Sequence, residues 1–203
     1  MVDVSWRPPG ERSERAERAE RADAARNRAK VLEAAERLFA EGDPHTVTMA
    51  DIARVAGVGR ATLYRRYPDP GSVAVALLDE HERRLQEQLL GGPPPLGPGA
   101  PPAARLAAFY TAMVDLLDRH LHLALGVETG RSRLTTGAYQ FWRAHVRGLV
   151  RQARAGDPDT LADVLLAPLA PEVYRYQRDD AGLSKTRIAR SLALLADHLL
   201  GET

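Results

Sequence analysis

The stretch Thr48-Met-Ala-Asp-Ile-Ala-Arg-Val-Ala-Gly-Val-Gly-Arg-Ala-Thr-Leu-Tyr-Arg-Arg-Tyr-Pro68 decides the fold of this 203-residue chain. It predicts two short helices joined by the tight turn Gly57-Val58-Gly59. Thr48 is placed to cap the first helix, and Asp51, three residues later, completes a capping box. Gly57 tolerates a positive φ and therefore ends that helix. This pattern is typical of a helix-turn-helix.

The second of these helices has little to bury and carries strong positive charge. Leu63 is its only strongly apolar residue before Tyr67, and between Ile52 and Pro68 there are four arginines and no acidic residue. The net charge of the whole chain is only +1. A local basic patch attracts phosphates whatever the net charge, so the segment predicts binding to nucleic acid.

The segment from about Arg26 to Leu78 resembles the DNA-binding head of the TetR family of bacterial transcriptional regulators. The resemblance rests on three features: an amphipathic helix over Lys30–Gly42, a Thr-capped helix over Thr48–Ala56, and the signature Thr62-Leu63-Tyr64. It implies an all-α protein with an N-terminal three-helix helix-turn-helix head. A C-terminal helical-bundle domain for regulation and dimerisation would follow. Beyond the head the resemblance is one of layout, which does not identify a ligand.

Residues 1–24 are a charged arm in which Glu and Arg recur with a period near three. Ion pairs at i,i+4 spacing are available, but no apolar stripe accompanies them. A helix that is polar all round is either solvated or marginally stable, so we expect a flexible arm. The alternative is an arm that follows DNA through Arg7, Arg12 and Arg15.

The rest of the chain divides into two predicted domains. Residues 25–71 are the helix-turn-helix domain, and residues 72–203 are the ligand-binding and dimerisation domain. The second domain begins with a connecting helix over 72–90 and a loop over 91–102, where prolines and glycines prevent regular structure. Further helices are predicted over 106–121, over 135–154, from the cap Asp157 and from the cap Ser184.

The predicted DNA-binding residues lie at the start of the first helix and along the second: Thr48, Gly59, Arg60, Ala61, Thr62, Tyr64, Arg65 and Arg66. Arg60 is the candidate for reading a base, since arginine in the first turn of a recognition helix pairs with guanine. The alternative for Arg60 is a phosphate contact alone. The resemblance implies phosphate contacts from Thr48, Thr62, Tyr64 and Arg66. Capping is a compatible role for Thr48, and packing between helices is the alternative for Tyr64.

The second domain contains side chains that suit the wall of a ligand cavity: Tyr110, Met113, Leu117, His120, Phe141, Trp142 and His145. The same side chains at helical spacing are also typical of a packed core. A metal held by His120, His122 and Glu128 is not expected, because a two-residue spacing on a helix points the rings to different sides. We expect neither a metal nor a cofactor.

A homodimer is expected, because one head makes few contacts while a palindromic operator presents two half-sites. Similar proteins dimerise through their late apolar helices. The residues that this implies for the interface are Leu161, Val164, Leu165, Ile188, Leu192, Leu195 and Leu199.

Composition excludes several classes of protein. The chain has no cysteine, which rules out disulfides, thiolate metal sites and thiol sensors. No apolar run approaches the ~20 residues that cross a bilayer, and no signal peptide is evident, so we expect a cytoplasmic protein.

The sequence therefore predicts a transcriptional regulator, a repressor by resemblance, that leaves its operator when an unidentified small-molecule effector enters the second domain. One alternative is a ligand-independent dimeric regulator whose second domain only dimerises or docks a protein. The other is a helical-bundle enzyme with His120, Glu128 or His145 as acid–base groups. No phosphate loop or nucleophile elbow supports catalysis, so no enzyme is expected. A cavity of several hundred Å³ would favour control by a ligand.

Overall fold

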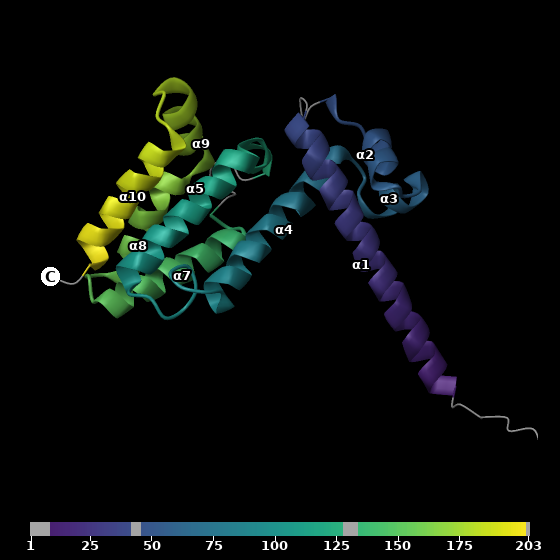
Figure 1. Ribbon diagram of the computed structural model, residues 1–203, viewed down its shortest axis with the longest axis horizontal. Coiled ribbons are helices and arrows are strands. Elements are labelled where there is room, and N and C mark those ends of the chain that lie inside the picture. The colour runs from purple at the N-terminus through teal and green to yellow at the C-terminus, as the bar shows by residue number, and fades with distance from the viewer. Residues whose placement is uncertain (1–8, 42–45, 128–133, 202–203) are drawn as a thin grey trace, which may run out of the picture. The chain divides into compact units, whose positions relative to one another are not determined.

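The computed structural model describes the backbone of residues 9–41, 46–127 and 134–201, and the side chains of these ranges from residue 17 onward. The described residues form helices and no strand (Figure 1), which confirms the all-α prediction. Contacts divide the chain into two compact units, Met1–Leu77 and Leu78–Thr203.

The first unit is a three-helix head closed by the start of a fourth helix. Its elements are α1 (Pro9–Glu41), α2 (Met49–Ala56), α3 (Arg60–Arg66) and the first turns of α4 (Pro70–Gly91). α1 packs on α2, and α2 packs on α3. The buried side chains come from all four helices and include Val31, Leu32, Phe39, Ile52, Leu63, Val73 and Leu77. The head thus has a core of its own.

The turn between α2 and α3 has the predicted geometry. Thr48 caps α2 and forms a capping box with Asp51, and Gly57 ends the helix at φ 64°. Gly59 precedes α3 without a side-chain cap, and Leu63, at 2% exposure, fixes that helix to the core. The predicted helix-turn-helix is therefore confirmed.

α1 begins at Pro9, where we expected a flexible segment through residue 24. Within the extended part, Arg21 pairs with Glu17 at 3.7 Å, four residues apart. Each such pair adds only a few tenths of a kcal/mol. Nucleation is the costly step in helix formation, so a helix held by the buried turns near Val31 is extended at little cost. Of the arginines proposed to follow DNA, Arg7 and the side chains of Arg12 and Arg15 lie outside the described residues.

The division between the two units falls inside α4 and not at its start. α4 begins at Pro70, close to the predicted start, but Val73 and Leu77 are buried and belong to the first unit. The head therefore extends about six residues beyond the boundary that we expected at residue 71.

The second unit is a helical bundle. Its elements after α4 are α5 (Pro102–Val127), α7 (Gly137–Ala153), α8 (Pro158–Leu166), η2 (Ala167–Leu169), α9 (Pro171–Arg175), η3 (Tyr176–Asp180) and α10 (Lys185–Leu200). α10 lies along α5, and α7 packs on α8 and on α5 (Figure 1). Asp157 and Ser184 cap α8 and α10 as predicted. α5 departs from helical geometry at His120, where φ is −129°.

The loop between α4 and α5 lacks regular secondary structure, as predicted, and is closely packed. Gly97 is buried, and a Cβ atom on it would lie 1.8 Å from the carbonyl oxygen of Gly92. Arg105 at the start of α5 donates a hydrogen bond to the Leu89 carbonyl at 3.1 Å. These contacts hold the two ends of the loop together.

Candidate DNA-binding face and effector cavity

The structure leaves the predicted DNA-binding residues accessible. All of them are exposed: Thr48, Gly59, Arg60, Ala61, Thr62, Tyr64, Arg65 and Arg66. Leu63 and Tyr67 are 2% and 6% exposed and hold α3 to the head. Tyr64 is 51% exposed, which argues against packing between helices as its role. α3 therefore presents a polar and basic face to its surroundings.

The hydroxyl of Thr48 is occupied by its cap. Its Oγ1 accepts a hydrogen bond from the Asp51 backbone N–H at 3.2 Å and donates to the Asp51 carboxylate at 2.5 Å. The hydrogen bond from Thr48, followed by that from Arg54, lowers the pKa of Asp51. A phosphate at this helix start would therefore meet the backbone N–H groups of the first turn, which lack intrahelical partners in any helix, more readily than the Thr48 hydroxyl.

Two hollows flank α3 and divide its polar residues. The first, about 360 Å³, lies between α2 and α3 and is lined by Asp51, Arg54 and Arg60 among others. The second, about 430 Å³, lies between α1 and α3. Its polar lining is Glu20, Asp23, Asn27, Arg28, Thr62, Arg65 and Arg66. Arg60 thus faces α2, while Thr62, Arg65 and Arg66 face α1.

Three polar residues beside α3 were missed by the sequence analysis. Arg54 of α2 lines the first hollow, and Asn27 and Arg28 of α1 line the second. The arginine content of α2 was a usable signal for Arg54. Asn27 and Arg28 depend on how α1 crosses α3, which periodicity along one helix does not determine.

A small cavity of about 30 Å³ lies within the second unit. Of the predicted ligand residues, Met113, Leu117, His120 and Trp142 line it. The remaining wall comes from other helices and includes Leu78 and Glu82 of α4, Tyr139 of α7, and Leu166. This volume is far below the several hundred Å³ that would indicate a preformed site for a drug-sized ligand.

The other three predicted ligand residues do not line this cavity. Tyr110 is fully buried, and its hydroxyl donates to the Leu165 carbonyl at 3.0 Å; burial raises its pKa. Phe141 lies edge-on against Trp142, with ring centres 5.4 Å apart. His145 packs against Phe109 at 5.5 Å, and burial lowers its pKa to about 4. Tyr110 thus belongs to the core, the alternative that the sequence left open, while Phe141 and His145 are half-buried beside it.

His120 and Glu82 are the buried polar groups on the cavity wall, each 6% exposed. The ring of His120 stacks on that of His81 at 4.0 Å. Burial, then the charges of His81, Arg119 and His122, lower the pKa of His120 to about 4, so its ring is neutral at pH 7.

Glu82 was missed, although the sequence held a signal for it. Leu78, Leu85 and Leu89 form the apolar stripe of α4, and Glu82 falls between them at helical spacing. An acidic residue in a core position is the kind of exception that indicates function.

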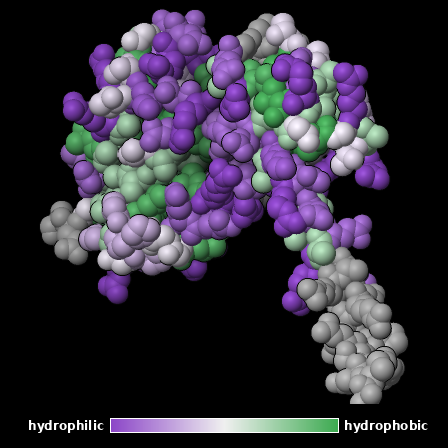
Figure 2. Space-filling view, turned by 45° about the vertical axis from the view of Figure 1, so that its right-hand side comes forward, coloured by the Kyte–Doolittle hydropathy of each residue, from purple (hydrophilic) through white to green (hydrophobic). Residues whose placement is uncertain are grey.

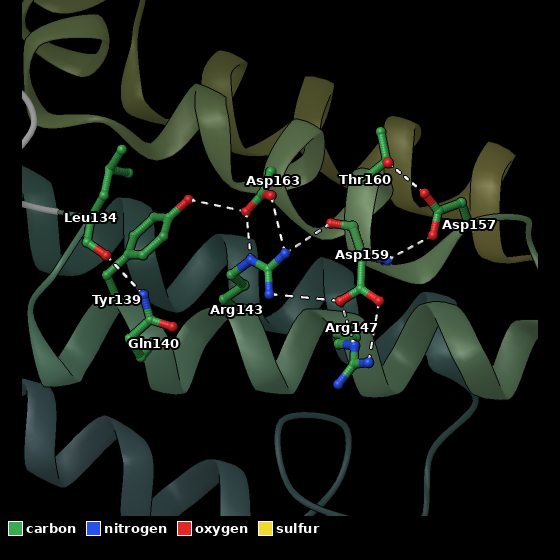
Figure 3. Close-up of polar contacts among 9 residues, drawn as sticks. All are labelled: Leu134, Tyr139, Gln140, Arg143, Arg147, Asp157, Asp159, Thr160 and Asp163. Atoms are coloured by element: carbon green, nitrogen blue, oxygen red, sulfur yellow. Dashed lines mark hydrogen bonds and ion pairs between the residues drawn. The ribbon is translucent and has the colours of Figure 1, made fainter.

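Hydrogen bonds and ion pairs between α7 and α8 hold Tyr139 on the cavity wall (Figure 3). Its hydroxyl lies 3.5 Å from the Asp163 carboxylate, which accepts a hydrogen bond from Arg143 at 2.7 Å. Arg147 pairs with Asp159 at 2.7 Å one turn further along. These contacts connect Tyr139 on the cavity wall to Asp159 and Asp163 of α8.

The predicted dimerisation residues fall into two groups. Leu165, Ile188 and Leu192 are buried within the chain. The buried stripe of α10 runs at steps of four, through Ile188, Leu192, Ala196 and Leu200. Val164 and Leu199 are exposed, and Leu161 and Leu195 are half-buried. Leu194, which we did not predict, is 59% exposed.

Figure 2 shows hydrophobic areas between hydrophilic ones on the face in view. In the described part of the chain, no helix is both long and apolar enough to cross a membrane. Glu128, named above for a metal or an acid–base role, lies outside the described residues.

Comparisons with known proteins agree with this geometry. Residues 31–69 match the family model for bacterial regulatory proteins of the tetR family. The uncharacterized HTH-type transcriptional regulator Rv1255c of Mycobacterium tuberculosis is 33% identical over 102 residues. That alignment covers 50% of this chain and 49% of the relative, so the chain matches about half of the relative's length.

Solved structures share the fold over most of the chain. A protein from Saccharomonospora viridis in complex with choline is 22% identical, with a TM-score of 0.68 over 87% of this chain and 98% of that one. The transcriptional regulator FadR from Bacillus subtilis, in complex with stearoyl-CoA, is 16% identical, with a TM-score of 0.64 over 86% and 99%. Residues 31–69 therefore match the DNA-binding region of the TetR family, and the solved structures share the fold of the chain.

Proposed function

We propose that this protein is a sequence-specific repressor of transcription that binds a palindromic operator as a homodimer. The observation that carries the proposal is the exposed basic face of α3, held to the head by Leu63 and Tyr67. In this account α3 enters the major groove, Arg60 reads a base edge, and Thr62, Tyr64, Arg65 and Arg66 contact phosphates.

Dimerisation follows from the size of the head and from apolar surface left on the second unit. A head with one seven-residue recognition helix makes few base contacts, while specific affinities require more. Val164 on α8 and Leu194 and Leu199 on α10 are exposed large apolar residues, which suit an interface between copies.

An effector is proposed to act through the cavity of the second unit. Proteins of this fold from S. viridis and B. subtilis were solved with small molecules, which supports effector binding here. Leu78 and Glu82 line the cavity, while Val73 and Leu77 of the same helix are buried in the head. An effector that displaces Leu78 and Glu82 would therefore shift α4 and release the operator. It suffices that the effector binds one arrangement of α4 more favourably than the other by ~1 to 3 kcal/mol.

A ligand-independent regulator is the second candidate, and the cavity volume of about 30 Å³ favours it. This volume holds a group no larger than one or two water molecules. Effector control therefore requires side chains on the cavity wall to move. Met113 is the one that moves most easily, because its side chain is unbranched and flexible.

Selection of operators from random duplex DNA at near-physiological salt tests the proposal. The expected result is an enriched inverted repeat whose half-sites are about one helical turn apart. Salt-sensitive binding without any enriched sequence would contradict it.

A further inference from the structure

We propose that the hollow between α1 and α3 receives a backbone phosphate of the DNA, and that the carboxylate of Glu20 on α1 weakens this contact. Glu20 thereby limits how tightly the head holds DNA of any sequence. The inference rests on the DNA binding proposed above, and it adds α1 to the surface that meets the DNA backbone.

The hollow lies where a DNA backbone passes when α3 enters the major groove. That groove is about 12 Å wide, and an α-helix with its side chains is about 10 to 12 Å across. The two backbones that border the groove therefore meet the flanks of the helix. Arg60 lines the hollow on the α2 side of α3, whereas Arg65 and Arg66 line the hollow on the α1 side. One backbone therefore passes on the side where α1 lies.

The hollow, about 430 Å³, has groups on two helices that bind phosphate. Arg65, Arg66 and Thr62 line it from α3, and Asn27 lines it from α1. In the described ranges, the side chains of Arg65, Arg66 and Asn27 have no hydrogen bond or ion pair. Guanidinium groups bind phosphate through charge-assisted hydrogen bonds, and the Asn27 amide adds a neutral donor. These side chains are therefore available to a phosphate that enters between α1 and α3.

Two carboxylates also line this hollow from α1, and one of them is unpaired. Asp23 forms an ion pair with Arg26, which offsets its charge. Glu20 is exposed and forms no ion pair with any residue that the structure describes. Its charge repels a phosphate held by Arg65 and Arg66 across the same hollow. Since this repulsion depends on charge and not on base sequence, Glu20 lowers the affinity for all DNA alike.

The test uses two acidic residues of α1 as a matched pair. Glu20→Gln removes a carboxylate from the hollow, while Glu33→Gln makes the same change in net charge at an exposed position that does not line it. Anisotropy of a labelled duplex of random sequence gives the Kd of the full-length variants at about 50 and about 200 mM potassium chloride. Glu20→Gln should bind about two- to fivefold more tightly than wild type at the lower salt, and less so at the higher. Glu33→Gln should bind as wild type does.

Asn27 gives a change of the opposite sign in the same hollow. Asn27→Ala removes a donor and should weaken binding to the random duplex by about two- to tenfold. Asn27→Asp places a further carboxylate there and should weaken binding more. In a protein that carries Arg65→Gln and Arg66→Gln, Glu20→Gln should lose most of its effect, because the phosphate that it repels is no longer held there. Thermal unfolding of each variant verifies that the fold is retained.

Three results would each overturn the proposal: equal affinities of Glu20→Gln and Glu33→Gln for the random duplex, wild-type affinity of Asn27→Asp, or a full effect of Glu20→Gln without the two arginines. Because Glu20 is exposed, its variant tests the proposal even where an Asn27 variant does not fold. Operator selection is measured separately. An enriched operator with no effect of Glu20→Gln refutes the phosphate contact in the hollow alone. The expected effects of the variants without any enriched sequence refute sequence-specific repression alone.

Discussion

Thr48 and Asp51 form reciprocal hydrogen bonds at the start of α2. The Asp51 backbone N–H donates to Thr48 Oγ1 at 3.2 Å, and the Thr48 hydroxyl donates to the Asp51 carboxylate at 2.5 Å. The cap fixes the entry of the helix that supports α3. Its hydroxyl is not free for a phosphate, although the resemblance to TetR proteins implies such a contact.

Thr48→Ala should therefore act mainly on stability. Loss of the cap should lower the free energy of unfolding of the head by about 1 kcal/mol, while Thr48→Ser should retain most of it. Urea unfolding and the salt dependence of DNA binding are the two measurements. If Thr48→Ala left stability unchanged and lowered the salt slope of DNA binding by about one, Thr48 would be a phosphate contact and not mainly a helix cap.

Arg60→Ala should change which operators are preferred, because it removes a side chain that reads a base edge. Arg66→Ala is the matched control from the same helix. It should weaken binding to all sequences alike and lower the salt slope by about one. The check is anisotropy titration of each variant with operator and with random DNA. An equal loss on both DNAs for Arg60→Ala would remove its base-reading role.

Gly97→Ala should destabilise the second unit by several kcal/mol or force the loop after α4 to rearrange, since the new Cβ would stand 1.8 Å from the Gly92 carbonyl oxygen. Gly91→Ala is the control, because a Cβ there meets nothing within 4 Å. Thermal unfolding of the two variants should differ clearly. Similar Tm values would show that the loop is not packed as described.

The buried His120 and the half-buried His145 predict a loss of stability in mild acid. The pKa of His120 and that of His145 are each lowered to about 4 from the usual 6.5, chiefly by burial. The unfolded chain therefore binds more protons between pH 6.5 and 4. Stability is complete above pH 6.5 and falls as the pH is lowered towards 4, by an amount on the order of 3 kcal/mol per histidine.

Urea unfolding at pH 7, 5.5 and 4.5 measures this slope. His145→Gln should flatten it, because it removes one of the two histidines whose pKa is lowered. A slope that His145→Gln leaves unchanged would assign the acid sensitivity to other groups.

Capping signals in the sequence predicted both ends of α2 and the starts of α8 and α10, but not the start of α1. Thr48, Gly57, Asp157 and Ser184 act through neighbours within a few residues, and the structure has each in its predicted role. The helix-turn-helix follows from these short-range rules, and so does the exposure of the α3 residues.

What the sequence did not determine depends on packing between helices. The burial of Leu165, Ile188 and Leu192 is decided by helices distant in the sequence. Tyr110 and His145 suit a core and a cavity wall equally well, so only the fold assigns them. Glu82 was within reach of sequence analysis, because it interrupts the apolar stripe of α4.

The most direct test of the account is the ratio of two affinities. The Kd of the purified protein is measured at near-physiological salt for the operator obtained by selection and for a scrambled duplex of the same length and composition. The account predicts tighter binding to the operator by about 10³-fold or more, with two subunits per duplex. Equal affinities for the two duplexes would contradict sequence-specific repression by this protein.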